Sequence, residues 1–394
     1  MSILIDSLFN SVAYGHLIVD VINSQRAILL TYWSTELHWS ETHLAFLTMI
    51  YIWGASLSQP VFGWLSAKFG KSHWIAAGGI FWISGFFALA LTLPTNLAVP
   101  CLILASFGSA AFHPVGAMQA TLQGRRHYVN KETTATSWYF VFGQFGLMVG
   151  PIIGGLLLLW RGQIALSVLA LIAMPIGINV AWQLKKASIK LSDTANDHPS
   201  SHNKISYSRW GFLSLVLLAS FQAWSQQNMI TFIPKYLSDL RKSTAVYGLM
   251  IGLFMGGSAL GNVVGGTLAD RFGKQKVITT MLILASIPII GISLVGWSFW
   301  LYFLVPLAGF FSGSVHSIIV VLSQHIIRSG LALATGLTLG FMFSAGALGT
   351  LLSGWMADTS GFPLMFQFTA GLVAVAACLP FFIREIAQKD TIEA

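Results

Sequence analysis

Histidine and aspartate side chains occur in segments of this chain that are otherwise strongly apolar. Gly15-His16-Leu-Ile-Val-Asp20 places an imidazole and a carboxylate four residues apart, so on a helix they share one face. A carboxylate at membrane depth costs about 2.5–3.5 kcal/mol on insertion scales, and such residues usually serve a function. The spacing therefore predicts that Asp20 carries a proton and that His16 adjusts its proton affinity; the alternative is a static structural pair.

Two short loops are near copies of each other at an offset of 203 residues. They read Gly63-Trp-Leu-Ser-Ala-Lys68-Phe-Gly70-Lys71 and Gly266-Thr-Leu-Ala-Asp270-Arg271-Phe-Gly273-Lys274. The same offset relates His113 to His316, and Phe140, Gly143 and Gly146 to Phe343, Gly346 and Gly349. A shared offset for loops and apolar segments predicts two related halves.

The composition indicates a chain surrounded by lipid. Of its 394 residues 55% are hydrophobic and 9% are charged, against about 25% charged in soluble domains. The first apolar stretch lacks the features of a cleavable signal peptide and carries His16, Asp20 and Arg26, so we interpret it as a membrane span. We found no nucleophile–base pair and no metal-ligand spacing near the end of a span, and therefore expect no enzyme activity, no cofactor and no metal.

Apolar runs of about 20 residues, the length that crosses a bilayer, predict an all-α membrane protein with twelve transmembrane helices in two pseudo-symmetric six-helix bundles. The predicted spans are 6–32, 41–66, 73–93, 97–121, 134–159, 163–184, 209–237, 244–269, 276–296, 299–322, 331–356 and 362–383. A polar break at 185–208 separates an N-terminal bundle, 1–184, from a C-terminal bundle, 209–394.

Basic residues predict the orientation of the chain in the membrane. With both termini in the cytoplasm, 16 of the 21 lysines and arginines fall in inner loops and tails, as the positive-inside rule requires. This skew accounts for the net charge of +8, so we expect no nucleic-acid partner.

Three motifs resemble known transporters. The loop at 266–274 resembles the signature of the major facilitator superfamily, and the loop at 63–71 is a weaker copy in which Ala67 replaces the usual Asp. Gly146-Leu-Met-Val-Gly150-Pro151-Ile-Ile-Gly154-Gly155 resembles a motif of proton-coupled drug antiporters in that superfamily, where the proline kinks the helix. The Gly15–Asp20 stretch and Gly108-Ser-Ala-Ala-Phe112-His113-Pro114 resemble the fosmidomycin-resistance branch, although Val115 stands where that branch has Glu.

The resemblance implies a central cavity lined by spans one, four, seven and ten. It places the proton-coupling pair, Asp20 and His16, in that cavity. The further residues predicted to line the cavity are His113, His316, Arg26, Gln222, Gln226 and Gln144. Within the spans basic groups outnumber the single acid, which favours a neutral, zwitterionic or anionic solute.

These patterns predict a monomeric secondary transporter in a bacterial inner membrane. Its partners would be a small polar or amphipathic solute, protons and the lipid bilayer. Proton-coupled efflux by alternating access is favoured; a proton-coupled symporter or a uniporter for nutrient uptake is the alternative.

Overall fold

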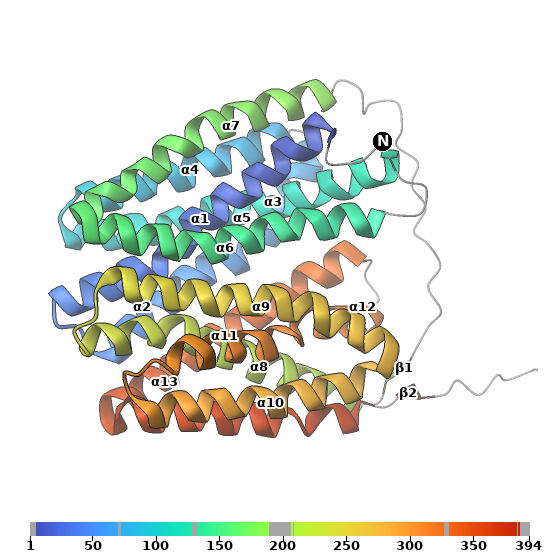
Figure 1. Ribbon diagram of the computed structural model, residues 1–394. Helices are drawn as coiled ribbons and strands as arrows, with labels where there is room; N and C mark the ends of the chain where they lie inside the picture. Colours follow the sequence, from blue (N-terminus) through green and yellow to red (C-terminus); the bar gives the residue numbers. More distant parts are fainter. Residues whose placement is uncertain are drawn as a thin grey trace, which may run out of the picture.

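The computed structural model describes residues 5–69, 72–127, 132–188, 206–207, 209–326, 331–383 and 385–386. This part of the chain is almost entirely helical, as predicted, and the helices run roughly parallel to one another (Figure 1). The one sheet in it is a two-stranded antiparallel pair, β1 (Ser206–Tyr207) with β2 (Glu385–Ile386). This pair joins the predicted polar break to the C-terminal tail.

The first half of the chain forms one group of helices (blue to green in Figure 1). Its helices are α1 (Ser7–Glu36), α2 (Glu41–Leu57), α3 (Gln59–Phe69), α4 (Ser72–Thr92), α5 (Thr95–His127), α6 (Glu132–Arg161), the 3-10 turn η2 (Gln163–Leu166) and α7 (Ser167–Ser188). The helix α7 continues four residues into the segment expected to be a linker, and residues 189–205 and 208 lie outside the described part.

The second half forms a similar group (yellow to red in Figure 1). Its helices are α8 (Arg209–Asp239), α9 (Thr244–Phe272), α10 (Lys274–Val295), α11 (Leu301–Gly313), α12 (His316–Ile326), α13 (Leu331–Ala376) and the 3-10 turn η4 (Leu379–Phe382). Gly361 interrupts α13 with φ 81° and ψ 164°, a conformation open to glycine. This break divides α13 close to where the sequence predicts two spans.

Nine helical segments of the described chain are long and apolar enough to cross a membrane. The longest, Leu337–Phe382, contains most of the last two predicted spans. The first helix of each half, α1 and α8, is not among the nine, because several buried polar side chains interrupt its apolar sequence. The architecture supports the predicted twelve-span fold, with polar groups concentrated in these two pseudo-equivalent helices.

Most contacts between the two halves are formed by α1, α2 and α6 on one side and α8, α9 and α13 on the other. Several polar contacts lie at the end of the bundle where α1 ends and α2 begins, which we call the closed end. There Thr35 and Ser238 share a hydrogen bond of 2.8 Å, and Lys235 Nζ lies 2.9 Å from Glu41 Oε1. The Asp358 carboxylate accepts hydrogen bonds from the backbone N–H groups of Glu41 and Thr42, at 2.7 and 2.8 Å, and so caps α2 across the interface.

Candidate proton and solute site

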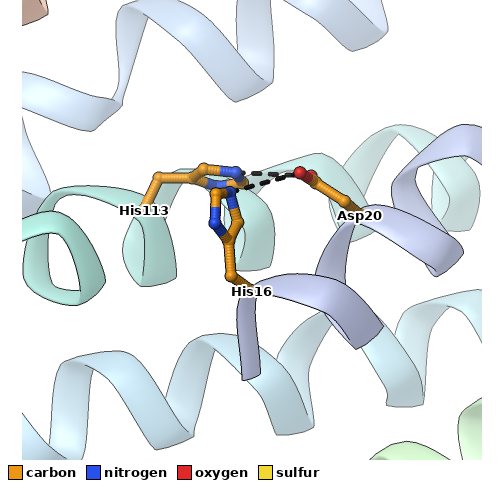
Figure 2. A group of neighbouring side chains, drawn as sticks. All are labelled: His16, Asp20 and His113. Atoms are coloured by element: carbon orange, nitrogen blue, oxygen red, sulfur yellow. Dashed lines mark ion pairs between the residues drawn. The ribbon is translucent and has the colours of Figure 1, made fainter. Parts of the chain in front are cut away.

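Asp20 lies between two histidines from different helices. Its Oδ2 is 3.2 Å from His16 Nε2 on the same helix α1, and its Oδ1 is 3.3 Å from His113 Nε2 on α5. Figure 2 shows the two imidazole rings meeting the carboxylate from α1 and α5. The His16 and Asp20 side chains are 4% and 6% exposed and that of His113 is 22% exposed, so His113 is the member that open space reaches most easily.

Backbone carbonyls determine which nitrogen of each imidazole faces Asp20. His16 Nδ1 lies 2.9 Å from the Tyr139 carbonyl, and His113 Nδ1 lies 2.8 Å from the Ser109 carbonyl. A carbonyl oxygen can only accept, so each Nδ1 carries hydrogen and donates. In a neutral ring the Nε2 would then be a bare lone pair facing a carboxylate oxygen. Each of the two contacts is attractive only when a proton lies in it, on Nε2 or on the carboxyl group.

The packing of α1 against α5 and α6 holds this cluster together. A Cβ on Gly15 would lie 2.9 Å from the Phe112 ring, so the glycine allows α1 to approach α5 at this level. A Cβ on Gly143 would overlap the His16 ring and would lie 2.8 Å from Asp20 Oδ2. The Tyr139 ring stacks on His16 with centroids 4.0 Å apart. The two sequence stretches that carry the subfamily resemblance therefore meet in space.

His316 does not join this cluster. It begins α12, its ring stacks against Phe343 at 6.2 Å, and it has no hydrogen bond or ion pair with any other described residue. The 203-residue offset also places Ala219 and Ala223 where the first half has His16 and Asp20. The His–Asp–His arrangement is therefore confined to the first half, although the backbone is duplicated.

The other predicted cavity residues differ in their surroundings. Arg26 is buried on α1, and its guanidinium lies 5.6 Å from the centre of the Tyr51 ring. Gln222 donates to Gln226 Oε1 and to the Ser312 carbonyl, both at 3.2 Å. Gln226 in turn donates to Ser258 Oγ at 3.0 Å, so the pair connects α8 to α9 and α11 within the second half.

Gln144 lies half-buried on α6 and has no hydrogen bond with any other described residue. A solute-binding role for Gln144, Gln222, Gln226 and His316 stays a prediction.

The glycines of the α6 motif are sites of close helix approach. Added Cβ atoms at Gly146, Gly150 and Gly154 would overlap backbone or side chains of α1, and one at Gly155 would overlap the carbonyl oxygen of Thr244 on α9. Thr244 also donates from its hydroxyl to the Gly155 carbonyl at 2.8 Å. The motif thus packs α6 against its own half and against the other half at once; a kink at Pro151 stays a prediction.

The repeated loop motifs lie at helix ends. In the first, Gly63 is half-buried and Lys68 is exposed over the Trp64 ring, while Gly70 and Lys71 lie outside the described residues. In the second, Gly273 ends α9 with φ 92° and Lys274 begins α10.

The charged residues Asp270 and Arg271 of the second loop lie on the surface. Gly266 is half-buried in α9 and Arg271 lies over the Phe272 ring. Asp270 is exposed and has no ion pair with the described part of the chain. A conformational role for the two loops stays a prediction.

Tyr139, Ser109 and Gly143 belong to the site but were not predicted as site residues. Tyr139 and Ser109 accept from the imidazoles through backbone carbonyls, which every residue has, so these contacts leave no signal in the residue types; the Tyr139 ring in addition stacks on His16. Gly143 did stand out as part of the 203-residue repeat. That repeat identified a packing position without showing which side chain it accommodates.

His16, Asp20 and His113 also form a group whose ligand atoms lie within 4.8 Å of one another, close enough to share a metal ion. The two carboxylate oxygens already have one imidazole partner each, so protons alone explain the arrangement. The absence of a resident metal stays a prediction.

Comparison with known proteins agrees with this fold and this pattern of motifs. The family model for the Major Facilitator Superfamily matches residues 21–243 and again 214–393. The chain therefore belongs to the major facilitator superfamily: it is a multi-pass membrane protein and a secondary transporter of a small molecule, not an enzyme.

Similar proteins include a resistance protein. The chain is 26% identical over 393 residues to the fosmidomycin resistance protein of Escherichia coli K12, with 97% of this chain and 94% of that protein covered. It is 26% identical to the MFS-type transporter YfnC of Bacillus subtilis, with 82% and 78% covered. Similarity to the multi-drug resistance efflux pump PmrA of Streptococcus pneumoniae is 29% over 165 residues, 40% of this chain and 41% of the pump.

Solved structures share the fold at low identity. A bacterial homologue of the human lysosomal transporter Spinster, in an inward-facing and occupied conformation, matches with a TM-score of 0.77 at 13% identity over 95% and 96% of the two chains. The nucleoside transporter NupG matches with a TM-score of 0.69 at 13% identity over 95% and 98%. These likenesses confirm the predicted major facilitator fold.

Proposed function

We propose that this transporter exports a small polar or amphipathic solute across the bacterial inner membrane in exchange for protons. The observation that carries the proposal is the His16–Asp20–His113 cluster. The transporter acts as a monomer. Both of its termini lie in the cytoplasm, in keeping with the distribution of basic residues.

The cluster has the features that proton exchange requires. Two N–H···O contacts converge on one carboxylate, and each is attractive only with a proton in it. Removing a proton therefore weakens the contact between α1 and α5. Because His113 is the most exposed of the three, we infer that protons enter and leave through its ring.

Proton movement is linked to transport when the cluster faces each side of the membrane in turn. A proton taken up from the outer side and released to the cytoplasm supplies the free energy that moves a solute in the opposite direction. In secondary transporters the binding site lies near the bilayer midplane and two repeats rock around it. Asp20 lies near the middle of the 30-residue helix α1, which suits this position.

The direction of transport is inferred from relatives. The fosmidomycin resistance protein and the PmrA pumps carry resistance or efflux in their names. Uptake by symport would use the same cluster with the solute moving in the direction of the proton. Measuring whether cells exclude or accumulate the solute separates export by antiport from uptake by symport.

The first test uses whole cells. A bacterial strain that is sensitive to many antibiotics expresses the wild-type protein, Asp20→Asn or an empty vector, and is screened against a compound panel that includes fosmidomycin. We expect the wild type to raise the inhibitory concentration of at least one compound, and we expect a protonophore to remove that gain.

Asp20→Asn should insert in the membrane at wild-type levels but give no gain, because an amide cannot take up the proton. In proteoliposomes the compound found in this screen should move under a pH gradient with the wild type and not with the variant. Transport by Asp20→Asn at the wild-type rate would refute the assignment of the proton site.

A further inference from the structure

Arg26 is a buried cation with no acidic partner in the described part of the chain. The residue is 8% exposed, its Nη1 has no hydrogen-bond partner, and it forms no ion pair with any described residue. It lies six residues beyond Asp20 on α1, about 9 Å along the helix axis. Arg26 is thus separate from the proton cluster but close to it.

The carboxylates whose side chains the structure describes are occupied elsewhere or lie at the surface. Asp6 caps α1, Asp20 holds two histidines, Glu41 and Asp239 pair with Lys235, Asp358 caps α2, and Glu36 and Asp270 are exposed. None of them lies within ion-pair distance of Arg26. Its compensating negative charge must therefore come from outside this set.

Tyr51 and Asn23 hold one side of the guanidinium. The Arg26 guanidinium lies over the Tyr51 ring, and the Tyr51 hydroxyl donates to Asn23 Oδ1 at 2.7 Å. This hydrogen bond holds the Tyr51 ring of α2 against α1. The face of the ring stabilises the guanidinium cation but does not neutralise its charge. Asn23 is three residues before Arg26, so both lie on one face of α1, and Asn23 is half-buried rather than buried. Open space therefore reaches Asn23, one helical turn from the buried guanidinium.

We propose that Arg26 binds the anionic group of the transported solute, with Tyr51 keeping the guanidinium in place. The inference rests on the proposed function and specifies the class of solute: a small organic acid. A planar guanidinium offers two parallel N–H donors to a carboxylate or phosphate group. The second half has Met229 at the position that the 203-residue offset relates to Arg26, so the duplicated fold does not need a cation here.

Thermal unfolding of purified protein in detergent tests the proposal without a transport assay. The probes are benzoate and benzamide, which share a ring and nearly the same size but differ in charge, together with inorganic phosphate. At about ten times its Kd an anion should raise the melting temperature of the wild type by on the order of 2 °C. Benzamide should have no such effect.

Arg26→Gln should abolish the shift caused by the anions, and Arg26→Lys should retain part of it. Arg161→Gln is the matched control, because Arg161 also lies over an aromatic ring, 5.5 Å from the centre of Trp160, but is exposed. This control should respond to anions like the wild type.

Three results would overturn the inference: no anion stabilises the wild type, benzamide stabilises it as much as benzoate, or Arg26→Gln keeps the anion response. The Asp20→Asn protein separates this inference from the proposed function. Its anion response should survive even though its proton-driven transport is lost. A wild-type anion response together with undiminished transport by Asp20→Asn would reject only the proton assignment.

Discussion

Asp20 contacts two imidazoles at once, and this shared contact makes each histidine depend on the protonation of the other. His113→Gln keeps a side chain that can donate to Asp20, but it removes a ring that can gain and lose a proton. Because glutamine cannot carry a proton, we expect the pH-driven transport rate to fall about tenfold or more. The rate should also depend less on pH than that of the wild type, measured in proteoliposomes over a series of pH values.

The matched variant is His316→Gln, at the position related to His113 by the internal repeat. Its ring stacks on Phe343 and does not contact Asp20, so this variant should keep the pH dependence of the wild type. If His113→Gln and His316→Gln lost the pH dependence equally, the proton site would extend over both halves. Its assignment to the first half alone would then be wrong.

Local sequence rules predict the part of the site that lies on one helix, whereas the long-range part follows only from the family resemblance. His16 and Asp20 were predicted to meet because helical geometry fixes neighbours four residues apart. His113 was assigned to the same space only through a family resemblance, since no local rule links α1 to α5. His316 was predicted by symmetry, but symmetry of the backbone does not require symmetry of the side chains.

Among the helices, α6 contacts both halves of the molecule, so it is placed to link their movements. The glycines on one side of α6 pack on α1, beside the His16–Asp20–His113 cluster. Gly155 contacts α9 across the interface between the halves. Small residues allow membrane helices to approach this closely. We therefore propose that α6 transmits a movement of α1 to α9.

Gly155→Ala tests this coupling at the closed end. The new Cβ would overlap the Thr244 carbonyl, a backbone atom that cannot rotate away, and overpacking of this kind costs about 1–3 kcal/mol. We expect α6 and α9 to separate more often. Labelling of a reporter Ser238→Cys by an impermeant maleimide, with Cys101 and Cys378 replaced by Ala, should rise several-fold.

Gly78→Ala on α4 is the control, because an added Cβ there meets nothing within 4 Å. Equal labelling in the two variants would show that the overlap at Gly155 does not control the opening of the closed end.

Hydropathy predicted the helices well because the bilayer imposes both their length and their apolar composition. It could not reveal the interruption at Ser58, between α2 and α3, or the one at Ser314–Val315, between α11 and α12. Both breaks lie inside apolar runs, so mean hydropathy does not register them. Pro60, two residues after Ser58, lacks the N–H that a continuous helix would need there.

At the scale of the whole molecule, polar contacts join the two halves at the closed end. Hydrogen bonds and ion pairs from Thr35, Glu41 and Thr42 to Ser238, Lys235 and Asp358 hold the halves together at the closed end. If the termini are cytoplasmic, this end faces outward. Alternating access then requires these contacts to break in every transport cycle.

A reversible cross-link at the closed end tests whether the halves rock in this way. Thr35 Oγ1 and Ser238 Oγ are 2.8 Å apart, so sulfur atoms in their places come within reach of a disulfide. In a background without native cysteines, Thr35→Cys/Ser238→Cys should cross-link on oxidation and stop proton-driven transport, and a reductant should restore it. Each single cysteine should leave transport unaffected by oxidant. Full transport by the cross-linked protein would mean that the halves do not separate at this end, and the rocking mechanism would have to be abandoned.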